Sequence, residues 1–299
     1  MMERIIQYIK EHARDLEKKM YLYYFETGSK DSVVKALSQF QNEDGGFGHG
    51  LEPDFLNPAS TPIASWKAAK ILDDLQLDKN HTMIQSLIHY FIHTSDKHGW
   101  KYAFRIPSNN DYPHAPWWHY QEGSAYVGYL PTISILGFLY KYMDHSDPLY
   151  KDIEKAIDQG IHYLMENDIE DMHELVCYNE FYEYSCDQID CSNIHQRLMY
   201  LNIKAIEKDD SKWLNSYCAK PTQVFVSMHS PGVKEMMELI HKELDMTFRN
   251  RNDQGVFDIA WDWQQYPESF EKAKQIWMGI IALKMLRVAQ EYQFVKRHK

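Results

Sequence analysis

The sequence predicts an all-α fold, and three observations support this prediction. Apolar residues recur at helical spacing along most of the 299 residues, as they do on the buried face of an amphipathic helix. Val and Ile rarely alternate with polar residues, so no segment has a convincing strand pattern. Several expected helices end in a motif with a glycine, the residue that most readily ends a helix in a left-handed turn. The pattern indicates about ten or more helices with short connections.

Four helices are expected in the first third of the chain. A stripe of apolar residues over 5–20 predicts the first helix. Asp31 is the expected N-cap of the second. Thr61 and Pro62 predict the start of the third, because Thr is a common N-cap and Pro fits the first helical turn. The fourth covers roughly residues 81–93.

The remaining helices follow a long aromatic loop over residues 97–121. They are expected at 123–142, 148–166, 181–206, 211–217, 233–248 and 268–292. This chain length would permit about two domains. Because a closed barrel of helical hairpins often runs longer as one unit, we expect a single domain over residues 1–299.

Composition narrows the possible partners and the compartment. The formal net charge is −11, and no basic face typical of nucleic-acid binding is visible, so we expect no nucleic-acid partner. No window approaches the ~18 uncharged apolar residues that span a membrane, and the N-terminus lacks the apolar segment of a signal peptide. The four cysteines form no C-x-x-C pair, so no structural metal site is expected. These features predict a reduced, cytoplasmic protein.

A motif recurs weakly at four helix ends, at 40–47, 91–100, 163–168 and 248–257, although the third copy lacks its glycine. In each complete copy an acidic residue precedes a glycine and an aromatic residue follows it. The glycine permits a left-handed turn, and the acidic side chain can bond local backbone N–H groups. We expect the aromatic residue to fold back on the preceding helix.

The best copy, Gln41-Asn42-Glu43-Asp44-Gly45-Gly46-Phe47, resembles the Gln-x-x-Asp-Gly-Gly-Phe/Trp joint of the α/α-toroid superfamily of terpenoid cyclases and protein prenyltransferase β-subunits. In that superfamily the joint links outer and inner helices, and the next helix often opens with a cap similar to Thr61-Pro62. The resemblance implies a single α/α toroid, a barrel of helical hairpins with inner and outer rings.

The known catalytic machinery of this superfamily does not carry over. Its class II cyclases protonate the substrate with a D-x-D-D run, and Asp73-Asp74 lacks the first Asp of that run. Its prenyltransferases hold zinc with an Asp-x-Cys pair, and Asp187…Cys191 has the wrong spacing. The resemblance therefore predicts the architecture and leaves the activity open.

The first candidate site is the extension after the best joint. His49, Glu52 and Asp54 lie close together in sequence, and glycines flank His49. We treat these three as candidate catalytic residues, forming an acid–base group or part of a metal site. Alternatively, Glu52 and Asp54 cap the next helix or bond the backbone of the loop.

The second candidate site is the loop 107–120, which three prolines stiffen. It contributes His114 as a candidate catalytic residue. Its candidate substrate-binding residues are Asn109, Tyr112, Trp117 and Trp118. Stacked indoles could hold a sugar or an isoprenoid, or the loop could be a packed lid on the rim of the barrel. We expect His49, Asp54, His114 and Trp117 to converge at one end of the toroid.

Two further segments have weaker signals. Trp261 and Asp262 are candidate substrate-binding residues, and Asp258 would share a face with Asp262 if the segment were helical; rim packing of the tryptophans is the alternative. Glu180 and Glu183 could line an aromatic cavity, but solvent exposure is the interpretation that we favour.

These residues leave several functions open. The superfamily resemblance and the aromatic content of 14% favour a protein that binds a small apolar or aromatic-stacking ligand in the barrel mouth, as a cyclase or transferase would. The His and carboxylate residues favour a glycan-active lyase or hydrolase. A non-catalytic binding protein is the third hypothesis. The sequence indicates no particular cofactor and no oligomeric state.

Overall fold

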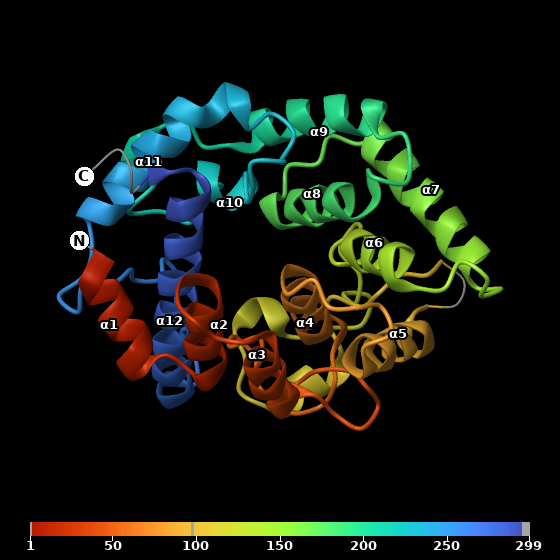
Figure 1. Ribbon diagram of the computed structural model, residues 1–299, viewed down its shortest axis with the longest axis horizontal. Coiled ribbons are helices and arrows are strands. Elements are labelled where there is room, and N and C mark those ends of the chain that lie inside the picture. Colours follow the sequence, from red (N-terminus) through yellow and green to blue (C-terminus); the bar gives the residue numbers. More distant parts are fainter. Residues whose placement is uncertain (1, 97–98, 295–299) are drawn as a thin grey trace. The chain divides into compact units, whose positions relative to one another are not determined.

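The computed structural model describes residues 2–96 and 99–294, and those residues form helices and connecting loops with no named strand (Figure 1). The all-α prediction is therefore confirmed. The chain divides into two compact units: a central unit of Phe40–Lys204, and a terminal unit of Met1–Gln39 with Ala205–Lys299. The expectation of a single domain over 1–299 stays a prediction. Among the described helices, none has the length and apolar character that crossing a membrane requires.

The central unit contains six long helices and two short 3-10 helices within its described residues. They are α4 (Pro62–Asp74), α5 (Thr82–Thr94), η2 (Pro107–Asp111), η3 (Pro116–Trp118), α6 (Thr132–Tyr142), α7 (Tyr150–Glu166), α8 (Met172–Ser185) and α9 (Ser192–Ala205). Figure 1 shows α4, α6 and α8 along the inner side of an arc, with α5, α7 and α9 along its outer side. This alternation of helices between two layers is what hairpin units produce.

Helix α6 forms the centre of this unit. It packs against α4, α5, α7 and α8, and ten of its eleven residues are buried. A helix that is apolar on all sides is stable only when neighbours cover it completely. Gly137 permits the close approach of α8, because a Cβ atom there would lie 2.9 Å from the Tyr184 ring.

The terminal unit combines both ends of the sequence. It holds α1 (Met2–His12), α2 (Asp15–Phe25), α3 (Lys30–Leu37), η4 (Asp210–Lys212), α10 (Pro221–Val224), η5 (Lys234–Met236), α11 (Met237–Arg249) and α12 (Pro267–Glu291), and η1 (Ser38–Phe40) overlaps the boundary between the units. Helix α12 packs against both α1 and α2, so the core of this unit needs residues from the two chain ends.

Two of the predicted joints have the same backbone geometry. Asn42 N–H donates to the carbonyl of Gly46 (2.9 Å), and Asn252 N–H donates to that of Val256 (2.9 Å). Gly45 and Gly255 have φ values of 86° and 82°, in the left-handed region where glycine is favoured. The expected function of the glycine is therefore confirmed at both joints.

The side chains of these joints differ in part from the expectation. Asp44 accepts from Gly46 N–H (2.9 Å), as predicted. At the second joint the Asn252 amide, not the acidic Asp253, accepts from Val256 N–H (3.1 Å). Phe257 packs edge-on against Phe248 of α11, with ring centroids 5.4 Å apart, so here the aromatic residue does fold back on the preceding helix.

Several predicted helix boundaries are wrong. The stripe over 5–20 is two helices, because Arg14 is extended between them. Ser29, not Asp31, caps α3. The helix expected over 123–142 begins at Thr132, since the glycines and Pro131 of the preceding segment form turns instead. The block 181–206 contains the end of α8 and all of α9, and the segment 211–217 begins within η4 and continues as turn.

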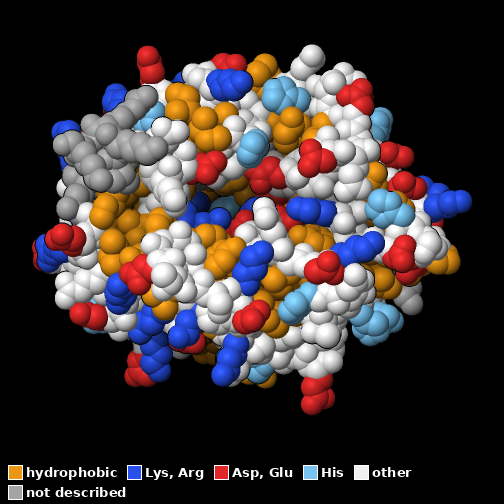
Figure 2. Space-filling view, in the orientation of Figure 1, with side chains coloured by type: hydrophobic (Ala, Val, Ile, Leu, Met, Phe, Trp, Pro, Cys, Tyr) orange, Lys and Arg blue, Asp and Glu red, His pale blue; other side chains and the backbone are white. Residues whose placement is uncertain are grey.

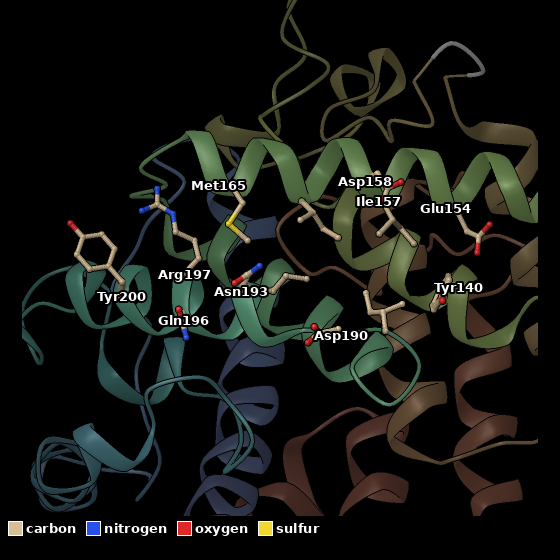
Figure 3. Close-up of a pocket in the computed structure, with 13 residues that line it drawn as sticks. Tyr140, Glu154, Ile157, Asp158, Met165, Asp190, Asn193, Gln196, Arg197 and Tyr200 are labelled. Carbon is tan, nitrogen blue, oxygen red and sulfur yellow. The ribbon is translucent and has the colours of Figure 1, made fainter.

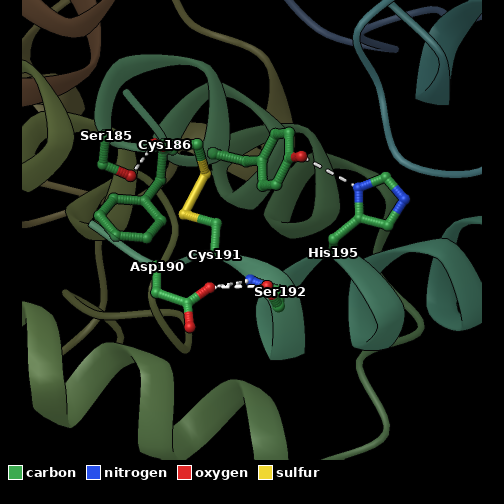
Figure 4. The surroundings of a disulfide bond; sticks show 8 residues. Ser185, Cys186, Asp190, Cys191, Ser192 and His195 are labelled. Atoms are coloured by element: carbon green, nitrogen blue, oxygen red, sulfur yellow. Dashed lines mark hydrogen bonds between the residues drawn. A yellow bond between two sulfur atoms is a disulfide. The ribbon is translucent and has the colours of Figure 1, made fainter. Parts of the chain in front are cut away.

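A disulfide joins Cys186, at the end of α8, to Cys191, just before α9 (Figure 4). Asp190 beside it accepts hydrogen bonds from Ser192 N–H (3.0 Å) and Ser192 O–H (2.6 Å). Tyr182 and His195 form a second link between the two helices, with 3.0 Å between the phenol oxygen and Nδ1. The expectation of reduced cysteines is therefore wrong for this pair.

Candidate functional site

The structure brings two of the predicted loops together. Phe55 and His114 form an antiparallel bridge. Leu56 N–H donates to the carbonyl of Pro113 (2.9 Å), and Ala115 N–H donates to that of Asp54 (2.8 Å). These bonds place Asp54 and His114 on paired extended segments of the central unit.

The candidate catalytic residues in these loops differ in exposure. Glu52, Asp54 and His114 are buried, with exposed fractions of 3%, 4% and 2%. His49 lies at the surface, where its Nε2 is 2.8 Å from Asn42 Oδ1. The backbone pairing brings the segments of Asp54 and His114 together, and the convergence of His49 and Trp117 with them stays a prediction.

The buried members of this group have structural partners. Glu52 forms an ion pair with Lys67 Nζ at 2.7 Å. The imidazole of His114 has Nδ1 2.6 Å from the Tyr112 carbonyl and Nε2 3.1 Å from His119 Nδ1. These contacts hold the Glu52 and His114 side chains in place. They are therefore consistent with a structural function in joining the two loops.

The aromatic loop 107–120 is a packed structure rather than an open stacking surface. Trp118 is buried, and its ring lies 5.1 Å from that of Phe55 and 4.6 Å from that of Phe104. Asn109 is also buried and donates to the Trp118 carbonyl (3.3 Å). Trp117 is half-buried and Tyr112 is exposed. This arrangement matches the packed-lid alternative.

Trp261 and Asp262 belong to the terminal unit, unlike the residues above. Their segment is not helical, so the condition under which Asp258 and Asp262 would share a helix face is not met. Trp261 packs edge-on against Trp277, with centroids 5.3 Å apart. Asp262 accepts from Gln264 N–H. Packing between the tryptophans and a local backbone hydrogen bond therefore account for the contacts of Trp261 and Asp262.

A second group of charged and polar side chains lies between helices of the central unit. We call it the lysine–carboxylate cluster, and it consists of Trp66, Lys70, Asp73 and Asp74 of α4, Ser134 and Lys141 of α6, and Glu180 and Glu183 of α8. Four carboxylates and two lysines leave it with an excess of negative charge. Buried charges are stable only when they are paired and hydrogen-bonded, so such a cluster calls for an explanation.

Glu180 is the buried carboxylate of the cluster, with an exposed fraction of 6%. Its Oε2 accepts hydrogen bonds from Ser134 O–H (2.6 Å) and from Trp66 Nε1–H (2.7 Å). Burial raises the pKa of Glu180, and this effect outweighs Lys70, Ser134 and Trp66, each of which lowers it. The expectation that Glu180 is solvated is therefore wrong.

Lys70 connects the carboxylates of the cluster. Its Nζ lies 3.3 Å from Asp74 Oδ1 and 3.7 Å from Glu183 Oε2. Burial alone would lower the pKa of Lys70, but the surrounding carboxylates, Asp74 first among them, raise it overall. Lys70 therefore stays a cation in the folded protein.

The outer side chains of the cluster, which we call its rim, are partly exposed to solvent. The side chains of Lys70, Glu183 and Asp74 have exposed fractions of 30%, 20% and 14%. Lys141 Nζ and the Tyr142 hydroxyl both donate to Asp73 Oδ1, at 2.5 and 2.8 Å. The rim therefore has contact with solvent, whereas Glu180 is buried.

Two other buried glutamates show what a purely structural carboxylate looks like here. Burial raises the pKa of Glu174 and of Glu243 as well. Glu174 accepts from Tyr129 N–H (2.6 Å), and Glu243 accepts from Thr222 N–H (2.7 Å). Both therefore hold a backbone segment, although Glu243 also accepts from the Thr222 hydroxyl (2.8 Å). The two bonds to Glu180 come from side chains alone.

Sequence reasoning missed this cluster because its residues lie on three helices. One signal was available: Trp66, Lys70 and Asp73 recur at helical spacing along α4. That spacing places the three side chains on one face of the helix. On α8, Glu180 lies between the aromatic residues Tyr178 and Phe181, which the structure buries, and these neighbours in the sequence were a second sign that it is not solvated.

No group of three or more His, Cys, Asp or Glu residues within the described ranges has an arrangement that could hold a metal ion. On the face that Figure 2 presents, acidic and basic side chains are interspersed with apolar ones. Comparison with protein-family models, with curated proteins and with solved structures gave no match. The functional argument therefore depends on the geometry of the site.

Proposed function

We propose that the lysine–carboxylate cluster is an acid–base site for a hydroxyl-rich ligand, a short glycan, and that Glu180 is the proton donor. The observation that supports this proposal is a buried glutamate with a raised pKa, fixed by side chains beside a partly open rim of carboxylates. An acid of this kind retains its proton at a pH where an exposed glutamate has lost it.

The proposed reaction is glycoside hydrolysis. Protonated Glu180 gives its proton to the glycosidic oxygen as the bond between that oxygen and the sugar carbon breaks. A rim carboxylate, Glu183 or Asp74, takes a proton from the water that attacks the same carbon. Lys70 forms ion pairs with both rim carboxylates, while Trp66 and Ser134 hold Oε2 of Glu180 in position.

This proposal takes the glycan-active alternative over an apolar ligand, because the site is charged. We also propose that the fold is a single α/α toroid related to terpenoid cyclases and prenyltransferases; the paired joints and the two helix layers of the central unit support that architecture. The proposed activity makes no use of the catalytic motifs of terpenoid cyclases and prenyltransferases, which the chain lacks. A cytoplasmic location remains part of the proposal.

The test is hydrolysis of a panel of 4-nitrophenyl glycosides and short oligosaccharides by the purified protein. Glu180→Gln should lower kcat by about 10²- to 10⁴-fold, the usual contribution of a general acid. Glu243→Gln is the matched control, since Glu243 is also buried and also has a raised pKa. It should leave kcat within about twofold of the wild-type value.

The pH profile supplies a second measurement. Activity should fall as pH rises through the raised pKa of Glu180, because only the protonated form can donate, and the variant should lack that limb. Circular dichroism establishes that each variant is folded. Equal losses in Glu180→Gln and Glu243→Gln would show a structural effect and contradict the assignment.

A further inference from the structure

The central unit contains a groove between α7 and α9 with a volume of about 880 Å³ (Figure 3). We call it the α7–α9 groove. Its lining includes five apolar side chains, Ile157, Ile161, Met165, Ile189 and Ile194. Ile157 and Ile194 are buried, whereas Ile161, Met165 and Ile189 are partly exposed. The floor is therefore apolar and accessible, and it shares no residue with the lysine–carboxylate cluster.

Acidic side chains mark one end of this groove. Figure 3 shows Glu154, Asp158 and Asp190 towards one end, with Arg197 and Tyr200 towards the other. The hydrogen bonds from Ser192 lower the pKa of Asp190, so its carboxylate stays ionised. Glu154 and Asp158 are exposed. The acidic end thus presents ionised carboxylates beside an apolar floor.

Arg197, the one arginine in the lining, already has hydrogen-bond partners within the central unit. Arg197 donates from Nε to the Leu164 carbonyl (3.1 Å), and from Nη2 to the Asn167 carbonyl (2.8 Å) and to Asp168 (2.9 Å). Asp168 pairs with Arg197 and also with Lys204. Among the lining side chains themselves, Glu154, Asp158 and Asp190 outnumber this one guanidinium, so the lining carries an excess of negative charge.

From these observations we infer that the α7–α9 groove binds an amphipathic basic helix of a partner protein. Apolar side chains three and four residues apart on that helix would lie on the isoleucine floor, and Lys or Arg side chains beside them would meet Glu154, Asp158 and Asp190. Helix-in-groove recognition uses this combination of apolar anchors and charge complementarity. The inference does not depend on the proposed glycosidase activity.

The experiment uses a fluorescein-labelled peptide of about 18 residues, built from Leu and Lys with the leucines on one helical face. Fluorescence anisotropy measures its Kd for the full-length protein. Asp158→Lys should weaken binding by about tenfold or more, since it places like charges together. Asp152→Lys changes the net charge equally on the same helix but outside the groove lining, and it should change Kd by less than about twofold.

Two further measurements separate the groove from general attraction to an acidic protein. Ile161→Ser should weaken binding without changing the charge, and a peptide of the same composition with scrambled leucines should bind much less tightly. Equal losses for Asp158→Lys and Asp152→Lys would overturn the proposal, as would equal binding of the scrambled peptide. Self-association of the wild-type protein that Asp158→Lys abolishes would overturn it in favour of a second copy of this chain.

Discussion

At the scale of single residues, the environment of a side chain decides what it can do. Glu174, Glu180 and Glu243 are all buried, and burial raises the pKa of each. Glu174 and Glu243 bond backbone N–H groups, and those bonds explain why they are buried. Glu180 bonds a serine and a tryptophan beside a lysine, so the same residue type has a chemical function in our proposal.

Gly45 provides a stability prediction at this scale. Its φ is 86°, and a Cβ atom there would lie 2.2 Å from the Ser86 carbonyl oxygen, a backbone atom that cannot rotate away. We expect Gly45→Ala to lower the free energy of unfolding by about 3 kcal/mol or more, from strain and steric overlap together. Urea denaturation measures the difference.

Gly123 is the matched control for this substitution. Its φ is 81°, but a Cβ atom there would have no neighbour within 4 Å. Gly123→Ala should therefore cost only the left-handed backbone penalty, about 1–2 kcal/mol. Similar values for the two variants would show that the contact with Ser86 has no importance for stability.

At the scale of elements, α4 shows how one helix serves both the fold and the candidate site. Thr61 caps it by accepting from Ala64 N–H (3.0 Å), and Pro62 occupies the first turn. One face of the helix buries Ile63, Ala68 and Leu72. Another face carries Lys70 and Asp74 towards Glu183. Correct placement of the cluster thus depends on a helix that begins at the right residue.

The cap gives a prediction for this element. Thr61 is 2% exposed, so Thr61→Ala should lower the free energy of unfolding by about 1–2 kcal/mol through loss of the cap. Ser29→Ala removes the equivalent bond at α3, where the serine is exposed, and should cost about 0.5 kcal/mol. Thermal and urea unfolding compare the two; a larger loss for Ser29→Ala would contradict this assignment.

At the scale of the whole molecule, the two units differ in how the chain builds them. The central unit is one continuous segment, whereas the terminal unit needs residues 1–39 together with 205–299. Gly279 of α12 lies close to Ala13 in the terminal unit, since a Cβ atom at residue 279 would lie 3.0 Å from Ala13 Cβ. Both ends of the sequence therefore stabilise one core.

This organisation predicts the outcome of Gly279→Leu. The larger side chain should overpack the contact with Ala13 and cost about 1–3 kcal/mol. Hydrogen exchange should become faster in both α1 and α12, because they belong to one cooperative unit, while α4–α9 keep their protection. Gln290→Leu, at an exposed position of the same helix, is the control and should leave exchange unchanged. A uniform increase across residues 40–204 would instead support the single domain that the sequence predicts.

Sequence reasoning found one part of the candidate site, the two loops that carry Asp54 and His114. The pairing of the Asp54 and His114 segments involves loops that were singled out by their composition, although their side chains turn out to have packing partners. Glu180 was noticed in the sequence but assigned to solvent. Its burial depends on Ser134 and Trp66, residues 46 and 114 positions away along the chain, and no local pattern records such contacts.

The sequence by itself determined the helical class, the start of α4 at Thr61-Pro62, and the left-handed turns at Gly45 and Gly255. These features depend on hydrophobic periodicity, caps and glycine conformation, which are properties of neighbouring residues. The tertiary structure alone decided that Lys70, Glu180 and Glu183 form one cluster, that α7 and α9 enclose a groove, and that Ala13 meets Gly279. Burial, pKa and complementarity arise only when distant segments pack together, so they follow from the whole fold.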